Sequence, residues 1–418
     1  GFLSIGGCIM NLNFSDRMSN IKASEIRELL KLTEQPEIIS FAGGLPAPEL
    51  FPKEKIGEIA KEVLFNEGAF ALQYTTTEGF APLRKIIVEE RMAPSGVKCD
   101  ISNIMLTNGS QQGLEFSAKL FVNKGDVIIC ESPSYLGAIN AFKAYEPKFI
   151  EISMDKDGMI IEELEKAIKE NDNVKMIYTI PDFQNPSGIT MSLERRKRLA
   201  ALAAKYEIPV IEDSPYGELR YDNEKLPAVK AFDESGFVIN LGTFSKTFCP
   251  GLRLGWIVAD TKILQKYILI KQGADLQCNT LSQVIAARYM EKYSLDEHIA
   301  SLIKVYKKRR DLMIDSMKTY FPKEVKFTIP EGGLFTWVEL KEGLDAKAIM
   351  EDALKEKVAY VPGGSFFPNG GKKNFFRLNY SNMNEEKIVE GIKRLGSVLD
   401  KYYCNCNSLE ETAAVKED

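Results

Sequence analysis

The sequence predicts an α/β protein whose large domain is built on a mostly parallel sheet of the seven-stranded type, covered by helices. A smaller α+β domain, formed by the C-terminus together with the N-terminal segment, is predicted beside it. One observation behind this is the alternation of strand-like and helix-like segments between residues 104 and 258. Another is the change after residue 282 to a long charged helix and then short strands. The length of 418 residues, with 44% of them hydrophobic, suffices for two domains.

The predicted parts have boundaries at residues 50 and 305. Residues 1–50 form an N-terminal segment that packs with the small domain, residues 51–305 form the large domain, and residues 306–418 form the small C-terminal domain. The tail after about residue 400 is expected to be frayed.

The N-terminal segment is predicted to contain a short amphipathic helix over residues 23–32, with Ser24 as its cap and Ile26 on the apolar face. A short strand over 38–41 follows and is broken by Gly43 and Gly44. Paired glycines let the backbone approach a ligand closely, although a plain turn would explain them as well.

The large domain begins with a helix, an exposed polar loop over 72–79 and a second helix. A strand over 104–107 then leads through residues 108–113 into a helix over 114–121. A helix that starts after such a turn offers free backbone N–H groups to a phosphate. The signal is weak alone, because any βα unit produces it and the GxGxxG fingerprint is absent.

Further strands and helices alternate up to residue 259. The strands are expected over 127–130, 149–152, 174–180, 209–213, 237–241 and 256–259, and the helices over 160–168 and 193–206. Polar side chains follow the strand ends, namely Ser110, Tyr135, Asn185, Asp213 and Lys246. In open parallel sheets, ligands bind beyond the carboxyl ends of the strands, so these side chains are expected at one site.

The C-terminal part has a different pattern of predicted elements. A charged helix is expected from about residue 282 to 320, with a break near Tyr293 and Ser294, followed by strands over 326–329, 334–339 and 374–379. This mixture suits the smaller α+β domain.

Charge and hydropathy exclude several classes of partner. The net charge is -5 and no long basic block occurs, so no nucleic acid is expected as a partner. Without a run of 18 apolar residues, no membrane association is expected. The opening residues 1–10 lack the basic and continuous apolar regions of a signal peptide.

Cysteine and histidine usage excludes further chemistry. The seven cysteines are scattered and lack paired CxxC spacings, so neither a disulfide framework nor a metal site is expected, and a cytoplasmic location fits best. Only one histidine occurs, His298, in a charged helical stretch. Ser-His-Asp, Cys-His and His-metal chemistry are therefore disfavoured.

Residues 242–256 place Lys246 between two apolar strand-like runs. A lysine desolvated in this way should be less basic and more nucleophilic than in water. The alternative is a solvated lysine on a loop, and only the rest of the chain separates the two.

Lys246, Asp213, Tyr216 and the Asn185-Pro186 pair together resemble the fold-type I pyridoxal-phosphate enzymes, and within them the class I/II aminotransferases. The resemblance extends over residues 24–395. It implies that Lys246 is the Schiff-base lysine, that Asp213 pairs with the pyridine nitrogen, and that Tyr216 and Asn185 bind the 3-oxygen of the ring. The cofactor implied is pyridoxal 5'-phosphate, bound by the large domain.

The resemblance also implies the remaining contacts. Tyr135 would stack on the ring, and the phosphate would be held by Ser110, Gln111, Thr243, Ser245, Arg253 and, from the neighbouring subunit of a homodimer, Tyr74. Arg377 would grip the substrate α-carboxylate.

The residue types suit these tasks. A carboxylate such as Asp213 keeps the ring nitrogen protonated, which an electron sink requires. A phosphate dianion favours hydroxyls, a helix N-terminus and an arginine. A planar carboxylate favours a bidentate arginine over a lysine.

Within the class, the motifs at 40–46, 73–74, 181–188 and 242–246 are similar to the 2-aminoadipate/kynurenine aminotransferase subgroup. This implies that Arg27 receives a distal substrate carboxylate and that Gly43, like Asn185 and Arg377, contacts the substrate. The implied donors are 2-aminoadipate, aromatic or branched-chain amino acids, with an acceptor such as 2-oxoglutarate. The reaction would follow ping-pong kinetics through a Lys246 aldimine.

Two alternatives remain open at this point. The same fold supports β-eliminating lyases and decarboxylases, because the cofactor site alone does not choose which Cα bond breaks. A transcription regulator with an aminotransferase-like domain is the other alternative, but a DNA-binding module would have to precede Ser24, where few residues stand.

Overall fold

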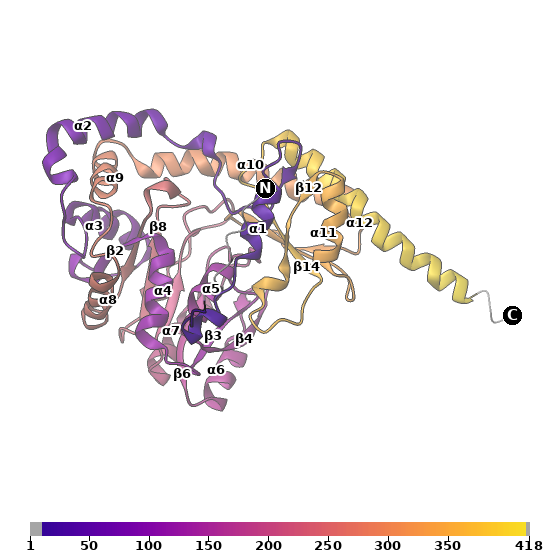
Figure 1. The fold of residues 1–418 in the computed structure, drawn as a ribbon, viewed down its shortest axis with the longest axis horizontal. Helices are drawn as coiled ribbons and strands as arrows, with labels where there is room; N and C mark the ends of the chain where they lie inside the picture. The colour runs from indigo at the N-terminus through magenta and orange to yellow at the C-terminus, as the bar shows by residue number, and fades with distance from the viewer. Residues whose placement is uncertain (1–10, 415–418) are drawn as a thin grey trace, which may run out of the picture.

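An eight-stranded sheet with the order β2-β9-β8-β7-β6-β3-β4-β5 forms the centre of the large domain in the computed structural model, which describes residues 11–414 (Figure 1). Its strands are β2 (Ile104–Asn108), β3 (Val127–Ser132), β4 (Lys148–Asp155), β5 (Gly158–Met159), β6 (Val174–Thr179), β7 (Val210–Asp213), β8 (Val238–Thr243) and β9 (Leu254–Val258). Neighbours from β8 to β4 are parallel, and β9 is antiparallel to both β2 and β8. The predicted sheet is confirmed, with the short antiparallel β5 added at one edge.

The sheet separates two apolar cores, because successive side chains of a strand point to opposite faces. In β3, Ile128 and Cys130 join one core, whereas Val127 and Ile129 join the other. The first core includes α4 (Gly109–Phe121), α5 (Leu136–Lys143) and α8 (Thr261–Ala274), and the second includes α6 (Ile161–Glu170) and α7 (Leu193–Tyr206). Burial on both faces explains why the strands read as continuous apolar runs.

The rest of the large domain is helical. It comprises α2 (Lys53–Ala71), α3 (Ala81–Ile87) and α9 (Thr280–Lys292). The predicted break near Tyr293 is confirmed, since α9 ends at Lys292 and α10 (Leu295–Tyr320) begins after Ser294, whose hydroxyl accepts the N–H of Glu297. α10 continues through residue 305 toward the small domain along the top of Figure 1.

The small domain contains a four-stranded sheet with the order β10-β11-β14-β13. The elements are β10 (Lys326–Phe327), β11 (Phe335–Glu339), β13 (Val361–Pro362), β14 (Phe375–Asn379), α11 (Ala346–Lys355) and α12 (Glu385–Ala414). The prediction of a frayed tail after about residue 400 is wrong as far as Ala414, because α12 continues to that residue.

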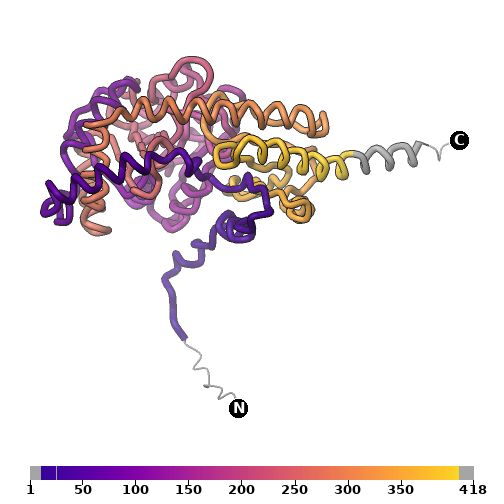
Figure 2. The backbone as a smooth tube through the Cα atoms, turned by 90° about the horizontal axis from the view of Figure 1, so that it is seen from above, coloured from indigo at the N-terminus to yellow at the C-terminus, as the bar shows by residue number. Residues whose placement is uncertain are grey.

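The N-terminal segment joins the small domain through β1 (Ile39–Ser40), which pairs in parallel with β12 (Val358–Ala359). The predicted short helix is α1 (Glu25–Leu32), capped by the Ser24 hydroxyl. Residues 11–20 extend away from the body and are exposed (Figure 2). The opening residues 1–10 lie outside the described residues.

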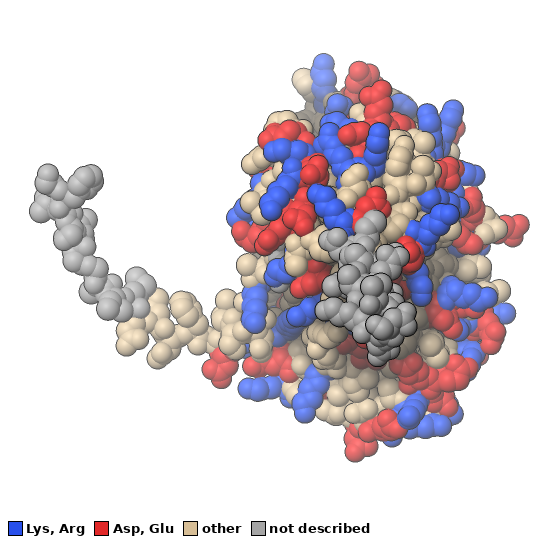
Figure 3. All heavy atoms as spheres, turned by 90° about the vertical axis from the view of Figure 1, so that its right-hand side faces the viewer, with Lys and Arg blue, Asp and Glu red and all other residues tan. Residues whose placement is uncertain are grey.

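Acidic and basic side chains are mixed over the face shown in Figure 3. Over the described range 11–414, no helix is both long enough and apolar enough to cross a membrane.

Candidate active site

A cavity of about 340 Å³ lies where the carboxyl ends of the central strands meet the small domain. Most of the residues predicted for the site line it, namely Ser110, Gln111, Tyr135, Asn185, Asp213, Tyr216, Thr243, Ser245, Lys246, Arg253 and Arg377. They come from several strands and from the turns and helix that follow them, so the fold brings together side chains that are far apart in the sequence. Its three cations, Lys246, Arg253 and Arg377, outnumber the single carboxylate of Asp213, which suits anionic ligands.

Asp213 is the last residue of β7 and is buried at the base of this cavity. Tyr178 donates its hydroxyl to Oδ2 at 2.7 Å, whereas Oδ1 is buried without a hydrogen-bond partner among the described residues. Burial raises the pKa of Asp213 to about 7, although the bond from Tyr178 opposes that shift. A buried acceptor of this kind suits a cationic N–H group of a ligand.

Lys246 lies in the turn after β8, and its ammonium group donates to the carbonyl oxygen of Gly44 at 2.8 Å. Burial, followed by the positive charges of Arg377 and Arg253, lowers the pKa of Lys246 to about 8. The predicted desolvated lysine is therefore present. Near neutral pH, a larger share of this amine is neutral than of an ordinary lysine, so it can act as a nucleophile and a base.

The N-terminus of α4 faces the cavity beside the turn that carries Ser245 and Arg253. The guanidinium Nη1 of Arg253 donates to Ser245 Oγ at 3.4 Å, and Gly109 has φ +70°. A Cβ on Gly109 would collide with the Arg253 guanidinium. A Cβ on Gly255 would lie 2.7 Å from Ser110 N. Both glycines therefore let the arginine and β9 approach the free N–H groups of α4, and this cradle suits a phosphate.

Arg377 comes from β14 of the small domain and is buried. Its Nη1 donates to Asn185 Oδ1 at 2.8 Å and its Nη2 to the carbonyl of Ala42 at 2.9 Å. Phe335 lies beneath the guanidinium, 4.1 Å from ring centroid to Cζ. Asn185 also donates from Nδ2 to the Tyr216 hydroxyl at 3.4 Å. These contacts join the two domains at the site.

Tyr74, Gly43 and Arg27 are not among the residues that line the cavity. Tyr74 is 77% exposed on the loop after α2. The carbonyl of Gly44, rather than Gly43, meets Lys246. Arg27 is exposed on α1, and its neighbour Ile26 lines the cavity instead.

Sequence reasoning missed Tyr178, Phe335 and the backbone carbonyl of Ala42. Tyr178 and Phe335 read as ordinary apolar strand residues, and only their position at strand ends near the predicted site could have drawn attention to them. A backbone carbonyl leaves no signal in the sequence.

These features define the class of protein. A carboxylate with a free buried oxygen, a phosphate cradle, a nucleophilic lysine and a buried arginine in one cavity fit an enzyme that binds pyridoxal phosphate and acts on amino acids. The fit rests on the unpartnered Asp213 Oδ1 and on the cradle that a Cβ on Gly109 would fill.

Comparison with known proteins points to the same class of enzyme. Residues 47–395 match the family of class I and II aminotransferases. An aromatic-amino-acid aminotransferase 1 of Thermococcus litoralis is 50% identical over 92% of this chain and 94% of its own length. A kynurenine aminotransferase of Pyrococcus horikoshii, crystallised with PMP, has a TM-score of 0.90 and 46% identity over 93% of this chain and 97% of its own.

A third relative is LysN, an α-aminoadipate aminotransferase of Thermus thermophilus, crystallised with N-(5'-phosphopyridoxyl)-L-leucine. It has a TM-score of 0.87 and 40% identity over 94% of this chain and 98% of its own. The chain therefore belongs to the class I and II aminotransferase family. It is an aminotransferase with pyridoxal phosphate as its cofactor, and the predicted family, fold, activity and cofactor are confirmed.

Proposed function

We propose that the cavity residues hold the cofactor in the roles that the sequence predicts. Lys246 would hold its aldehyde carbon and Asp213 its ring nitrogen, and Asn185 and Tyr216 would hold its 3-oxygen. The ring would lie against Tyr135. Its phosphate would be held by Ser110, Gln111, Thr243, Ser245 and Arg253. The single observation that carries this proposal is the shared cavity of Lys246, Asp213 and Arg377, because an amine, a carboxylate and a guanidinium converge there from three separate elements.

Bound pyridoxal phosphate supplies an electron sink that stabilises negative charge at the substrate Cα. Lys246 acts as the general base at that atom, because its lowered pKa leaves a neutral amine available. Arg377 binds the α-carboxylate with its planar fork and thereby orients the Cα–H bond toward Lys246. Since amino acid and oxo acid use this cavity in turn, initial rates should fit ping-pong kinetics.

The donor is an amino acid of the 2-aminoadipate, aromatic or branched-chain type, and the acceptor is a 2-oxo acid such as 2-oxoglutarate. The apolar walls formed by Ile26, Leu136 and Phe335 favour the aromatic and branched side chains. We propose that Arg27, next to Ile26, binds the distal carboxylate of a substrate and that Gly43 contacts the substrate.

The test is a panel of donors assayed with 2-oxoglutarate, for the wild type and for Arg27→Gln. Formation of 2-oxo acid in step with glutamate is expected. Arg27→Gln should raise KM for 2-aminoadipate and 2-oxoglutarate but not for leucine. Release of ammonia or carbon dioxide without an acceptor would contradict transamination.

The working unit is a homodimer with active sites at the subunit interface. This proposal is supported by large apolar side chains that are exposed on α2 and on the loop that follows it in the chain, namely Leu64, Phe65, Phe70, Leu72 and Tyr74. Leu12 and Phe14 are likewise exposed on the extended N-terminal segment. Tyr74 would then reach the cofactor phosphate of the neighbouring subunit.

A cytoplasmic location completes the proposal. It is supported by the free thiols of Cys99, Cys130, Cys249 and Cys278, as is usual in a reducing compartment.

A further inference from the structure

Two segments from different domains run side by side next to Phe183, in the loop that carries Asn185. Residues 219–222 follow the segment with Asp213, and residues 330–333 lead into β11. The N–H of Gly333 donates to the Leu219 carbonyl at 2.8 Å, and the N–H of Tyr221 donates to the Glu331 carbonyl at 2.8 Å. Because β11 pairs with β14, this contact links the large domain to the strand that carries Arg377.

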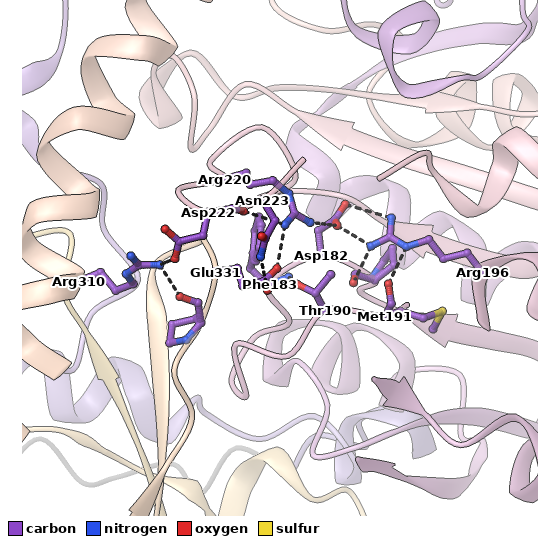
Figure 4. Close-up of polar contacts among 12 residues, drawn as sticks. Asp182, Phe183, Thr190, Met191, Arg196, Arg220, Asp222, Asn223, Arg310 and Glu331 are labelled. Carbon is purple, nitrogen blue, oxygen red and sulfur yellow. Dashed lines mark hydrogen bonds and ion pairs between the residues drawn. The ribbon is translucent and has the colours of Figure 1, made fainter. Parts of the chain in front are cut away.

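Arg220 stands at the centre of this contact (Figure 4). Its Nη1 donates to Glu331 Oε2 at 2.9 Å, and its Nη2 lies 3.9 Å from Asp182 Oδ1. The guanidinium lies 5.0 Å from the ring centroid of Phe183. The side chain is only 8% exposed, and its Nε and Nη2 have no hydrogen-bond partner in the described part of the chain. Arg220 therefore touches the 182–185 loop on one side and the small domain on the other.

The loop that carries Asn185 has little room to move. A Cβ on Gly332 or Gly333 would lie 2.5 Å from Phe183, and Phe183 itself has φ +47°. On the other side, Arg196 of α7 binds Asp182 Oδ1 at 2.6 Å and donates to the carbonyls of neighbouring loop residues (Figure 4). The loop is therefore held between α7 and the 330–333 segment at Asp182 and Phe183, shortly before Asn185.

We propose that Arg220 and Glu331 are positioning residues that fix Asn185 relative to Arg377, and thereby set the affinity for the α-carboxylate common to amino acid and oxo acid. This rests on the proposed role of Arg377 and Asn185. The link is geometric: Arg220 locates the Asn185 loop, Glu331 locates the strand of Arg377, and the two ends meet in the 2.8 Å bond from Arg377 to Asn185. A small displacement of such a pair weakens binding although no contact to substrate is lost.

Glu331 offers the milder test of the two positions, because its side chain is 45% exposed whereas that of Arg220 is only 8% exposed. In Glu331→Gln and Arg220→Gln, KM for the amino acid and for 2-oxoglutarate should both rise about tenfold, with kcat and the Kd for pyridoxal phosphate little changed. The double variant should resemble either single variant, because both act through one contact. Arg220→Lys, which keeps the charge, should recover part of the loss.

Arg195→Gln is the matched control. Arg195 donates to the Asp155 carboxylate through Nη1 and Nη2 within the large domain, and its side chain is only 15% exposed. The variant should leave both KM values unchanged. Unchanged KM values in folded Glu331→Gln, a rise for one substrate alone, or an equal loss of cofactor affinity would overturn the inference. If Arg377→Lys also leaves KM unchanged, the proposed role of Arg377 fails instead.

Discussion

Tyr178 donates its hydroxyl to one oxygen of Asp213 at 2.7 Å and leaves the other buried oxygen without a partner among the described residues. Tyr178 thus orients the carboxyl group, but no cationic side chain among the described residues donates a hydrogen bond to it. Its raised pKa shows that the ionised form is unfavourable until a cation pairs with it.

The stability of the cofactor-free protein should therefore depend on pH through Asp213. The folded protein keeps this proton up to about pH 7, whereas the unfolded chain releases it near the ordinary value of 3.8. The stabilising contribution is present below pH 3.8 and is lost as the pH rises to about 7. In urea titrations, the free energy of unfolding of the wild type should fall over this range relative to Asp213→Asn, by on the order of a few kcal/mol. Parallel curves would contradict the raised pKa.

Lys246→Ala should abolish transamination, because the neutral amine has no substitute in the cavity. We expect kcat to fall about 10⁴-fold. Lys246→Arg keeps the charge without a neutral amine and should be equally inactive. Steady-state assays with the best donor would measure kcat for both variants. A variant as active as the wild type would refute the assignment.

Gly109→Ala should weaken binding of pyridoxal phosphate. Its φ of +70° costs about 1–2 kcal/mol for a residue with a side chain, and the new methyl group would displace the Arg253 guanidinium. Gly251→Ala, in the same turn as Arg253, is the control, since its Cβ would meet no described atom within 4 Å. Cofactor titration of the apoproteins should show a raised Kd for the first variant alone. Equal Kd values would argue against the cradle.

The two arginines of the cavity should separate substrate affinity from cofactor affinity. Arg377→Lys loses the planar fork and should raise KM for both substrates by about 10²-fold, with cofactor Kd unchanged. Arg253→Lys should instead raise the cofactor Kd. Measuring both constants on both variants checks the assignment, and an exchange of the two effects would reverse it.

The sequence predicted the parts of the site that local pattern encodes. Lys246 between apolar runs and Asp213 at a strand end were placed correctly, because burial and parallel topology follow from hydrophobic periodicity. Contacts between domains could not be predicted in this way. The bond from Arg377 to Asn185 depends on how β14 packs against the large domain, and whether Ile26 or Arg27 faces the cavity depends on the rotation of α1.

The exposed apolar surface on α2 and the following loop should mediate dimerisation. Phe65 is 81% exposed and Leu72 is 71% exposed, and burying such side chains between two subunits is favourable by about 25 cal/mol per Å². A charge there would be desolvated at the interface. The double variant Phe65→Asp/Leu72→Asp should therefore sediment as a monomer when the wild type sediments as a dimer.

Cofactor affinity separates this interface from an incidental contact. If Tyr74 completes the phosphate site of the partner, the monomeric variant should bind pyridoxal phosphate more weakly, and Tyr74→Phe should reproduce that loss while remaining dimeric. Leu193→Asp, which alters an exposed leucine at the start of α7 instead, should change neither mass nor affinity. A monomeric wild type would remove the proposed interface. A dimer that keeps full cofactor affinity in Tyr74→Phe would leave the interface but remove the role of this hydroxyl, because the phosphate would then be held by one chain alone.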